Sequence, residues 1–449
     1  MINDTVLRYL VGAVLLAFSV GTAQAAMPAF IQLLEVLRNN GTINQEAYEM
    51  LRRAALEQPA KSSADAAGAD DKTSPDTKSE PRKHAKTAAK PKDKKRKIRA
   101  DGRLHVDLAN YQEENTELGN GGEVRRARIG AKGTLWNEWD FRASVEFAGN
   151  EVDLKSTYIR YTGLDRKEIT FGNFKEPFSL EELSSSNYST FMERAMATEF
   201  VPGRNIGLGF NTYREKWAFN VGGFREGGTS EGEADEGWGV TGRLTVAPML
   251  SKNRILHLGG AVSHRELGDE DTARFRTRPE SHVTDVRLVD TGDIVDVNDI
   301  VRLGAEASLV LGPWSLQSEY IATELDRKGD LPTLNFSGWY AYASWFLTGE
   351  SRSYDAVKGT FGKINPKGIV GMGGYGAWEL AARFSTIDLT DGDVVGGKED
   401  NFTLGLNWYA TPNIRFMLNY VDVLSIDRPG SSSDGDEPEI IQFRGQVNL

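Results

Sequence analysis

From about residue 101 to the end of the chain, apolar and polar residues alternate in a succession of short segments. In the segment 139–147, for example, Trp, Phe, Ala, Val and Phe alternate with Asp, Arg, Ser and Glu. The segments 413–420 and 441–449 repeat the pattern. Because successive side chains of a strand point to opposite faces, the pattern predicts strands with one apolar and one polar face. A membrane barrel and a soluble all-β protein both use such strands.

Sixteen candidate strands can be placed in the region 98–449. They are 103–111, 122–135, 137–149, 152–162, 167–175, 205–214, 217–226, 237–247, 254–266, 299–311, 313–325, 335–347, 376–387, 400–410, 413–424 and 439–449. Bacterial outer-membrane barrels have an even number of antiparallel strands. We therefore predict an all-β fold, a transmembrane β-barrel of sixteen antiparallel strands whose lumen is wide enough for water.

Composition favours the membrane barrel over the soluble protein. The mean hydropathy is −0.43, which excludes a helical membrane protein, whereas a barrel hides its polar half inside the lumen. Eight tryptophans fall near segment ends, as expected of aromatic girdles at the membrane interfaces, although ordinary cross-strand pairing would also place them there. The chain has no cysteine, so it has no disulfide framework.

The first residues resemble an export signal. Residues 1–25 contain a basic Arg8, a short apolar stretch and the sequence Ala-Gln-Ala at 23–25, so we predict a signal peptide cleaved after Ala25 rather than a retained anchor. In 26–58, helical spacing interrupted at Gly41 predicts a short helical hairpin. Because it is too small for a core of its own, the hairpin either forms a coiled coil with its copies or packs on the periplasmic face of the barrel.

A basic linker follows the hairpin. Residues 59–97 contain no Phe, Tyr, Trp, Leu, Ile or Val, which predicts disorder. The linker has 12 basic and 6 acidic residues, a net charge of +6, so the rest of the chain carries −17. It is either a solvated spacer or a contact with anionic cell-wall polymer or lipid. Nucleic acid is not an expected partner of an exported chain with this overall charge.

The connections between strands differ in length. Short turns at 312–313 and 411–412 are expected to face the periplasm, and long connections at 227–237, 268–298, 349–374 and 425–437 to face outward. The connection 176–203 is unusual because it is rich in Phe, Leu and Met. We predict that it folds into the barrel and narrows it, with an outward cap as the alternative.

Basic residues fall on the polar faces of many strands. Strand parity places Arg126, Arg128, Lys132, Arg142, Arg243, Arg383, Arg415 and Arg444 on polar faces, and Lys175, Arg194 and Arg204 in or beside the connection 176–203. Such a row lowers the barrier for anions, and guanidinium groups bind phosphate oxygens bidentately. Each Arg has a structural alternative, an ion pair with a carboxylate such as Glu146, Glu193 or Glu379. Lys155 and Arg160 have ambiguous parity, and we leave them out.

Several sequence motifs resemble the phosphate-selective porin O and P family. They are RRARIG at 125–130, FGNFKEPFSLE at 171–181, FMERA at 191–195, PGRNIG at 202–207, RTRPE at 276–280, LTGE at 347–350, GAWELAAR at 376–383 and LNWY at 406–409. These motifs occur in order through the region 98–449. The resemblance implies a homotrimer of sixteen-stranded barrels in the outer membrane, in which the third loop folds inward and basic side chains lead anions to a constriction.

The hypothesis is a passive outer-membrane porin for small anions. Its solute is phosphate, polyphosphate, pyrophosphate or another oxyanion, or the channel has a general preference for anions. A barrel anchor or adhesin tied to the cell wall by the N-terminal segment is the alternative. An outer-membrane hydrolase is disfavoured, because GTSEG at 228–232 lies in an acidic, glycine-rich loop rather than on a strand-to-helix turn. The five histidines show no metal-ligand spacing, and His257 and His264 have opposite parities. We therefore expect no catalytic residue, metal or cofactor.

Overall fold

The computed structural model describes most of the barrel region and a few N-terminal residues. The described barrel residues are 97–449 without 151, 226–235 and 270. The described N-terminal residues are Glu35, Arg38, Gln45, Tyr48, Glu49, Arg52 and Arg53, all helical. The predicted signal peptide, the rest of the hairpin, nearly all of the linker and the GTSEG segment lie outside the described residues. The two parts are separate compact units, Met1–Ala89 and Lys90–Leu449.

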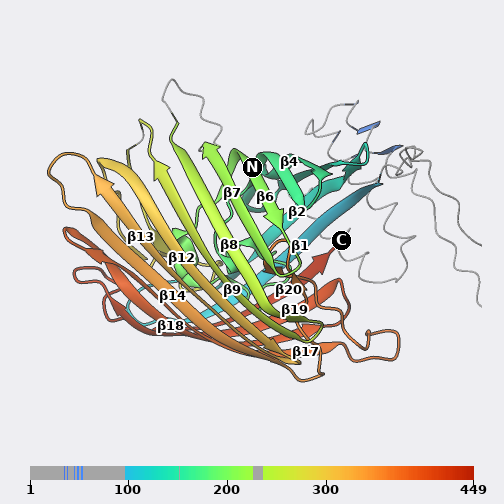
Figure 1. Cartoon of the computed structure of the whole chain (residues 1–449). Coiled ribbons are helices and arrows are strands. Elements are labelled where there is room, and N and C mark those ends of the chain that lie inside the picture. The colour runs from blue at the N-terminus through green and yellow to red at the C-terminus, as the bar shows by residue number, and fades with distance from the viewer. Residues whose placement is uncertain are drawn as a thin grey trace, which may run out of the picture. The chain divides into compact units, whose positions relative to one another are not determined.

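The second unit is a closed barrel of sixteen antiparallel strands (Figure 1). Its strands are β1 (Lys97–Gln112), β2 (Gly121–Leu135), β3 (Trp139–Glu146), β4 (Asp153–Leu164), β5 (Lys167–Lys175), β6 (Arg204–Tyr213), β7 (Trp217–Arg225), β8 (Trp238–Ser251), β9 (Arg254–Glu266), β12 (Val297–Leu311), β13 (Trp314–Arg327), β14 (Leu334–Phe346), β17 (Ala377–Asp391), β18 (Val394–Tyr409), β19 (Ile414–Asp427) and β20 (Glu439–Asn448). Pairing of β1 with β20 closes the ring. The predicted fold class is confirmed.

The alternating pattern of the sequence becomes an apolar outer face and a polar inner face. In β20, Ile441 is 56% exposed and Phe443 is also exposed, whereas Gln442 and Arg444 are buried. Exposed apolar side chains facing outward and buried polar side chains facing inward are the arrangement that a lipid-embedded barrel requires. Among the described residues, no helix is long and apolar enough to cross a membrane.

Most connections obey the predicted division into short turns and long loops, but the connections from β14 to β17 and from β17 to β18 do not. The ends of β2, β4, β6, β8, β12 and β18 meet short turns at one end of the barrel, which we call the turn end. The connection 347–376 joins β14 to β17 at this same end, because strands alternate in direction around the ring. The prediction that 349–374 faces outward with the long loops was therefore wrong.

The connection 176–203 folds into the barrel, as predicted. It contains α4 (Leu180–Leu183) and η2 (Met196–Phe200), and η2 contacts β13, β14 and β17. Phe178 is fully buried, and a Cβ at Gly304 of β12 would lie 2.9 Å from its ring. Glycine at that position therefore leaves the space that Phe178 fills.

The connection 267–296 also enters the barrel, which corrects the prediction that 268–298 faces outward. It carries the short strands β10 (Arg276–Thr277) and β11 (Val289–Asp290). Its residue Glu280 is buried and accepts hydrogen bonds from Arg383, Ser385 and Thr403. The ring of Phe275 lies 5.3 Å from that of Phe200, so the two infolded connections pack on each other.

The two infolded connections fill one side of the lumen. Together with inward-facing apolar residues of β12–β14 and β17–β20, they form a continuous apolar core. The inner faces of β8–β20 are almost entirely buried, whereas those of β2–β6 are mostly half-buried. We call the inner faces of β8–β20 the packed side of the lumen, and those of β2–β7, together with residues 97–103 of β1, the open side.

The N-terminal unit shows contacts between two helical segments. The Tyr48 hydroxyl donates to Glu35 at 3.4 Å, and the Arg38 guanidinium lies 4.6 Å from the Tyr48 ring centroid. Gln45 donates to Glu49 at 3.0 Å, one turn further along the helix. Tyr48 is buried in these contacts.

Candidate functional site

The basic side chains of the packed side are buried. Arg243, Arg383, Arg415 and Arg444 donate to carboxylates or backbone carbonyls, although the Nε atoms of Arg383 and Arg415 have no partner among the described residues. Arg444 is 1% exposed, and its Nε and Nη2 donate to Asp107 at 2.7 and 2.5 Å. Its Nη2 lies 2.6 Å from Glu193, and its Nη1 donates to the Met192 carbonyl. One guanidinium thus joins β20, β1 and the infolded connection 176–203.

Arg383 and Arg415 also donate hydrogen bonds to the connection 176–203. Arg415 donates to the carbonyls of 189–190 at 2.6 and 3.1 Å. Arg383 donates to the Glu193 carbonyl at 3.1 Å and pairs with Glu280 of the other infolded connection. These two guanidinium groups donate to backbone carbonyls and to a carboxylate. They thereby hold the connections 176–203 and 267–296 against the barrel wall.

Arg243 and Arg128 are also buried in ion pairs. Arg243 donates to Glu306 at 2.9 and 2.5 Å and to the carbonyls of 358–359 at 3.0 and 2.8 Å. It thereby fixes the connection 347–376, part of which carries the short strands β15 (Tyr354–Asp355) and β16 (Thr360–Phe361). Arg128 donates to Glu146 at 3.0 and 2.8 Å, the carboxylate that the sequence suggested as a partner.

The open side holds basic groups with fewer partners. Within the described part of the chain, Arg103, Arg126 and Arg204 have no carboxylate at ion-pairing distance. Arg204 donates to the Ser156 hydroxyl at 3.3 Å, and Arg103 to Ser186 at 2.6 Å. The Arg126 Nε is buried without a hydrogen-bond partner among the described residues.

Two carboxylates on the open side are each shared by two cations. Asp101 lies 2.6 Å from Arg142 and 3.4 Å from Lys132, whose side chain is 46% exposed.

Glu182 lies 2.7 Å from Lys175 and 3.0 Å from Arg194. Burial raises the pKa of Glu182, but Arg194 and Lys175 more than offset this effect and lower the pKa to about 2. In each of the two sets, around Asp101 and around Glu182, one carboxylate is thus shared by two basic side chains.

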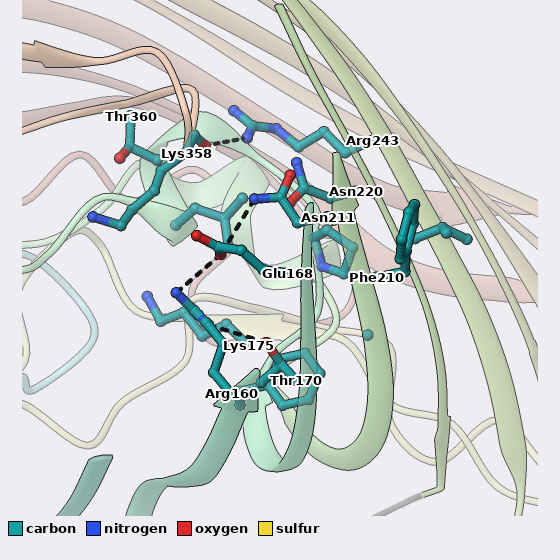
Figure 2. Close-up of a pocket in the computed structure, with 15 residues that line it drawn as sticks. Arg160, Glu168, Thr170, Lys175, Phe210, Asn211, Asn220, Arg243, Lys358 and Thr360 are labelled. Carbon is teal, nitrogen blue, oxygen red and sulfur yellow. Dashed lines mark hydrogen bonds and ion pairs between the residues drawn. The ribbon is translucent and has the colours of Figure 1, made fainter. Parts of the chain in front are cut away.

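A cavity of about 160 Å³ lies between the open side and the connections 176–203 and 347–376 (Figure 2). Its charged lining consists of Arg160, Lys175, Arg243, Lys358 and a single acid, Glu168. It has room for a small ion with a few water molecules.

The polar groups of the cavity come from five neighbouring strands, β4 to β8, and the turn-end connection. Arg160 lies 3.2 Å from Glu168 and donates to Thr170 at 3.1 Å. Asn211 donates to the same Glu168 at 3.4 Å, and Asn220 lines the wall beside it. Arg160, which strand parity left unassigned, is thus a lumenal residue. A register shift between Tyr161 and Leu164 explains why counting along β4 was ambiguous.

The structure therefore divides the eleven basic residues singled out in the sequence. Arg243, Arg383, Arg415 and Arg444 lie buried on the packed side, and Arg128 is buried in its pair with Glu146. Arg126, Lys132, Arg142, Lys175, Arg194 and Arg204 are brought together on the open side or on the part of 176–203 that faces it. Among the described residues no group of side chains could hold a metal ion.

With this geometry in hand, the comparison with known proteins identifies the family. The sequence profile described as Phosphate-selective porin O and P matches residues 98–449. The chain belongs to this porin family. An uncharacterized protein of Caulobacter vibrioides is 33% identical to the porin over 344 residues, covering 72% of this chain and 68% of that protein. Porin O of Pseudomonas aeruginosa is 25% identical over 386 residues, covering 77% and 87%.

Solved structures share the fold of the porin at low identity. An anion-selective porin from Comamonas acidovorans has a TM-score of 0.52 and 13% identity, over 79% of this chain and 100% of that one. OmpT, an outer-membrane protein of Vibrio cholerae, has a TM-score of 0.51 and 10% identity, over 81% and 100%. The protein is an outer-membrane porin built on the sixteen-stranded barrel.

Proposed function

We propose that this porin passively conducts small anions, phosphate or a related oxyanion above all, along the open side of its lumen. The observation that carries the proposal is that the basic side chains there outnumber their carboxylate partners. Arg103, Arg126 and Arg204 have no carboxylate partner among the described residues, and Asp101 and Glu182 are each divided between two cations. Uncompensated positive charge along a narrow aqueous path favours anions and repels cations.

The cavity in Figure 2 is the proposed narrow region of this path. Its lining has more basic groups than acids, although Arg160 is paired with Glu168, Lys175 with Glu182 and Lys358 with Asp355. Asn211 and Asn220 supply amide donors that can replace part of an ion's hydration shell. Arg160 presents a planar fork of donors that matches the oxygens of phosphate. The family description and the anion-selective relative in structure support the same solute class.

The remaining organisation of the chain is also a proposal. Residues 1–25 act as a signal peptide, 26–58 as a helical hairpin or coiled-coil segment, and 59–97 as a disordered linker ahead of the barrel at 98–449. The turn end and the N-terminal segment face the periplasm, where the basic linker is able to contact the cell wall. Three barrels assemble into a homotrimer, as the family resemblance implies.

The porin acts as a channel and not as an enzyme in this proposal. The described barrel histidines contact Asn187, Tyr354, Glu306, Asp299 and Glu123, so they are used in contacts that do not involve a serine nucleophile.

Single-channel recording in planar bilayers tests the solute. Current carried by chloride should be blocked when phosphate is added at millimolar concentration, and the Lys175→Glu variant should relieve the block because it places a negative charge at the cavity. Lys398→Glu makes the same charge change on the outer wall and should leave the block intact. Chloride current that phosphate does not affect would refute an oxyanion site while leaving the porin assignment untouched.

A further inference from the structure

The connection 347–376 divides into two parts with opposite surroundings. Its first part enters the lumen, where Phe361 is buried and the Arg352 guanidinium lies 3.7 Å from the Phe361 ring centroid. Its second part, 368–376, lies outside the lumen. We call residues 368–376 the flap. In Figure 1 it belongs to the orange loop that projects beyond the strand ends beside β17.

The flap is an ordered structure. The Gly376 amide donates to the Gly368 carbonyl at 3.0 Å, which closes the segment on itself. Val370 donates to the Ala410 carbonyl at 3.0 Å and so ties the flap to the next turn of the barrel. Gly371 and Gly373 have φ angles of 84° and 83°, a conformation that glycine adopts without strain.

The flap lies against the aromatic band on the outer wall. The indole Nε1 of Trp408 donates to the Tyr375 carbonyl at 2.9 Å. Trp408 faces outward and stacks on Trp378 and on Phe416, each with ring centroids 5.5 Å apart. Phe416 continues the band to Phe443. Outward aromatic rings near strand ends mark the membrane interface of barrels.

The flap directs its apolar side chains away from the protein. Met372 is 82% exposed and Tyr375 is 86% exposed, and Val370 is also exposed. Large apolar side chains with this exposure, grouped on one short segment, indicate a contact that the isolated barrel does not supply. Lys367 is exposed immediately before the flap.

We propose that the flap inserts Met372 and Tyr375 into the lipid monolayer at the turn end, as an extension of the aromatic band beyond the strands. Lipid is the occupant because the flap is continuous with the lipid-facing rings of Trp408 and Trp378. A tyrosine suits this depth, with its ring among acyl chains and its hydroxyl among headgroups. This inference concerns membrane anchoring and does not depend on the transported ion.

The full-length chain offers a clean test because it has no cysteine. Met372→Cys and Tyr375→Cys variants are labelled with an environment-sensitive fluorophore and refolded into vesicles of phosphatidylcholine and phosphatidylglycerol. Quenching by doxyl-labelled lipid is then compared with quenching by aqueous iodide. Leu418→Cys, on the exposed outer face of β19, is the lipid control, and Ser432→Cys, in the loop at the other end, is the aqueous control.

The proposal requires labels at 372 and 375 to behave like the label at 418, with blue-shifted emission, strong quenching by doxyl-lipid and little by iodide. Behaviour like that of the label at 432 would place the flap in water and overturn the proposal. Protection from both quenchers would mean that another protein chain covers the flap, which also overturns it. Unchanged single-channel conductance of each variant establishes that the labelled barrel is folded.

A second variant needs no label. Met372→Ser combined with Tyr375→Ser keeps the glycines and the hydrogen bonds of the flap and removes its apolar groups. Its refolding into the same vesicles should be slower than that of the parent chain, with conductance of the inserted channels unchanged. Equal insertion rates would contradict a role of the flap in lipid contact.

Discussion

The open and packed sides of the lumen use the same residue type for different purposes. On the packed side, the Arg444 and Arg383 guanidinium groups are 1% exposed and are surrounded by carboxylates and loop carbonyls. On the open side, Arg126 and Arg204 face the lumen without a carboxylate partner among the described residues. An inward-facing arginine therefore does not by itself indicate an anion path. Its neighbours decide whether its charge is available to a solute.

The difference follows from the two infolded connections. Both 176–203 and 267–296 present backbone carbonyls and buried carboxylates to β17–β20, and these groups need donors because the apolar core around them excludes water. Arginine supplies up to five donors in a rigid plane, so one side chain satisfies several acceptors. The open side faces the remaining aqueous space, where water satisfies polar groups and charge stays available.

The largest expected effect tests the packed side. Arg444→Ala leaves Asp107 unpaired and removes one partner of Glu193, so the free energy of unfolding should fall by about 3–5 kcal/mol. Denaturant unfolding in lipid vesicles, followed by tryptophan fluorescence, measures the change. Lys398→Ala removes an exposed cation 3.7 Å from Asp400 on the outer wall and should change the free energy by less than about 0.5 kcal/mol. Equal effects of the two variants would contradict the distinction between the sides.

The next effect concerns charge on the open side. Arg204→Glu changes the local charge by two units, which at about 6 Å from an ion in water amounts to about 1.4 kcal/mol. The ratio of anion to cation permeability should therefore fall about tenfold, as measured by reversal potentials in salt gradients. Stability should change little, because Arg204 gives up only its hydrogen bond to Ser156. A large loss of stability with unchanged selectivity would move Arg204 to the structural group.

A smaller change in the ratio of anion to cation permeability, in the opposite direction, is expected when Glu182 is replaced. Glu182→Gln frees Lys175 and Arg194 from their shared carboxylate, and the one-unit change should raise the permeability ratio about threefold. Because the lowered pKa of about 2 keeps this carboxylate ionised, the increase should be the same at pH 7 and pH 4. Lys175→Gln is the matched control and should lower the ratio. An increase seen only at pH 7 would mean that Glu182 is protonated in the open channel.

The smallest change in conductance and stability is expected when Lys132 is replaced. Its side chain is exposed, and its 3.4 Å pair with Asp101 competes with the closer Arg142. Lys132→Gln should change conductance by less than about twofold and stability by less than about 0.5 kcal/mol. Arg142→Gln, which removes the closer partner of Asp101, should have the larger effect on conductance. The reverse order would show that exposure, and not pairing, ranks the cations of the open side.

Strand alternation predicted the barrel well because each strand must satisfy lipid on one face and the lumen on the other. All sixteen predicted strands are present, with ends that differ by up to six residues, and the apolar content of 176–203 correctly indicated infolding. His257 and His264 also lie on opposite faces, the first buried and the second half-exposed.

Features that depend on contacts between distant residues were missed. The acidic sequence of 267–296 looks solvated, and only the fold brings Glu280 to Arg383. The position of 347–376 at the turn end follows from counting strands, but its length suggested an outer loop. The pairing of each arginine was equally hidden, because partners such as Asp107 and Arg444 lie 337 positions apart. Pairing therefore has to be read from the structure.

Cysteine accessibility during current recording tests the central claim, that ions pass along the open side. Asn211→Cys lines the cavity, and Ser308→Cys is buried on the packed side. A negatively charged methanethiosulfonate reagent should reduce the current through Asn211→Cys channels and leave Ser308→Cys channels unchanged. Modification of Ser308→Cys with loss of current, or no effect at Asn211→Cys, would contradict the account.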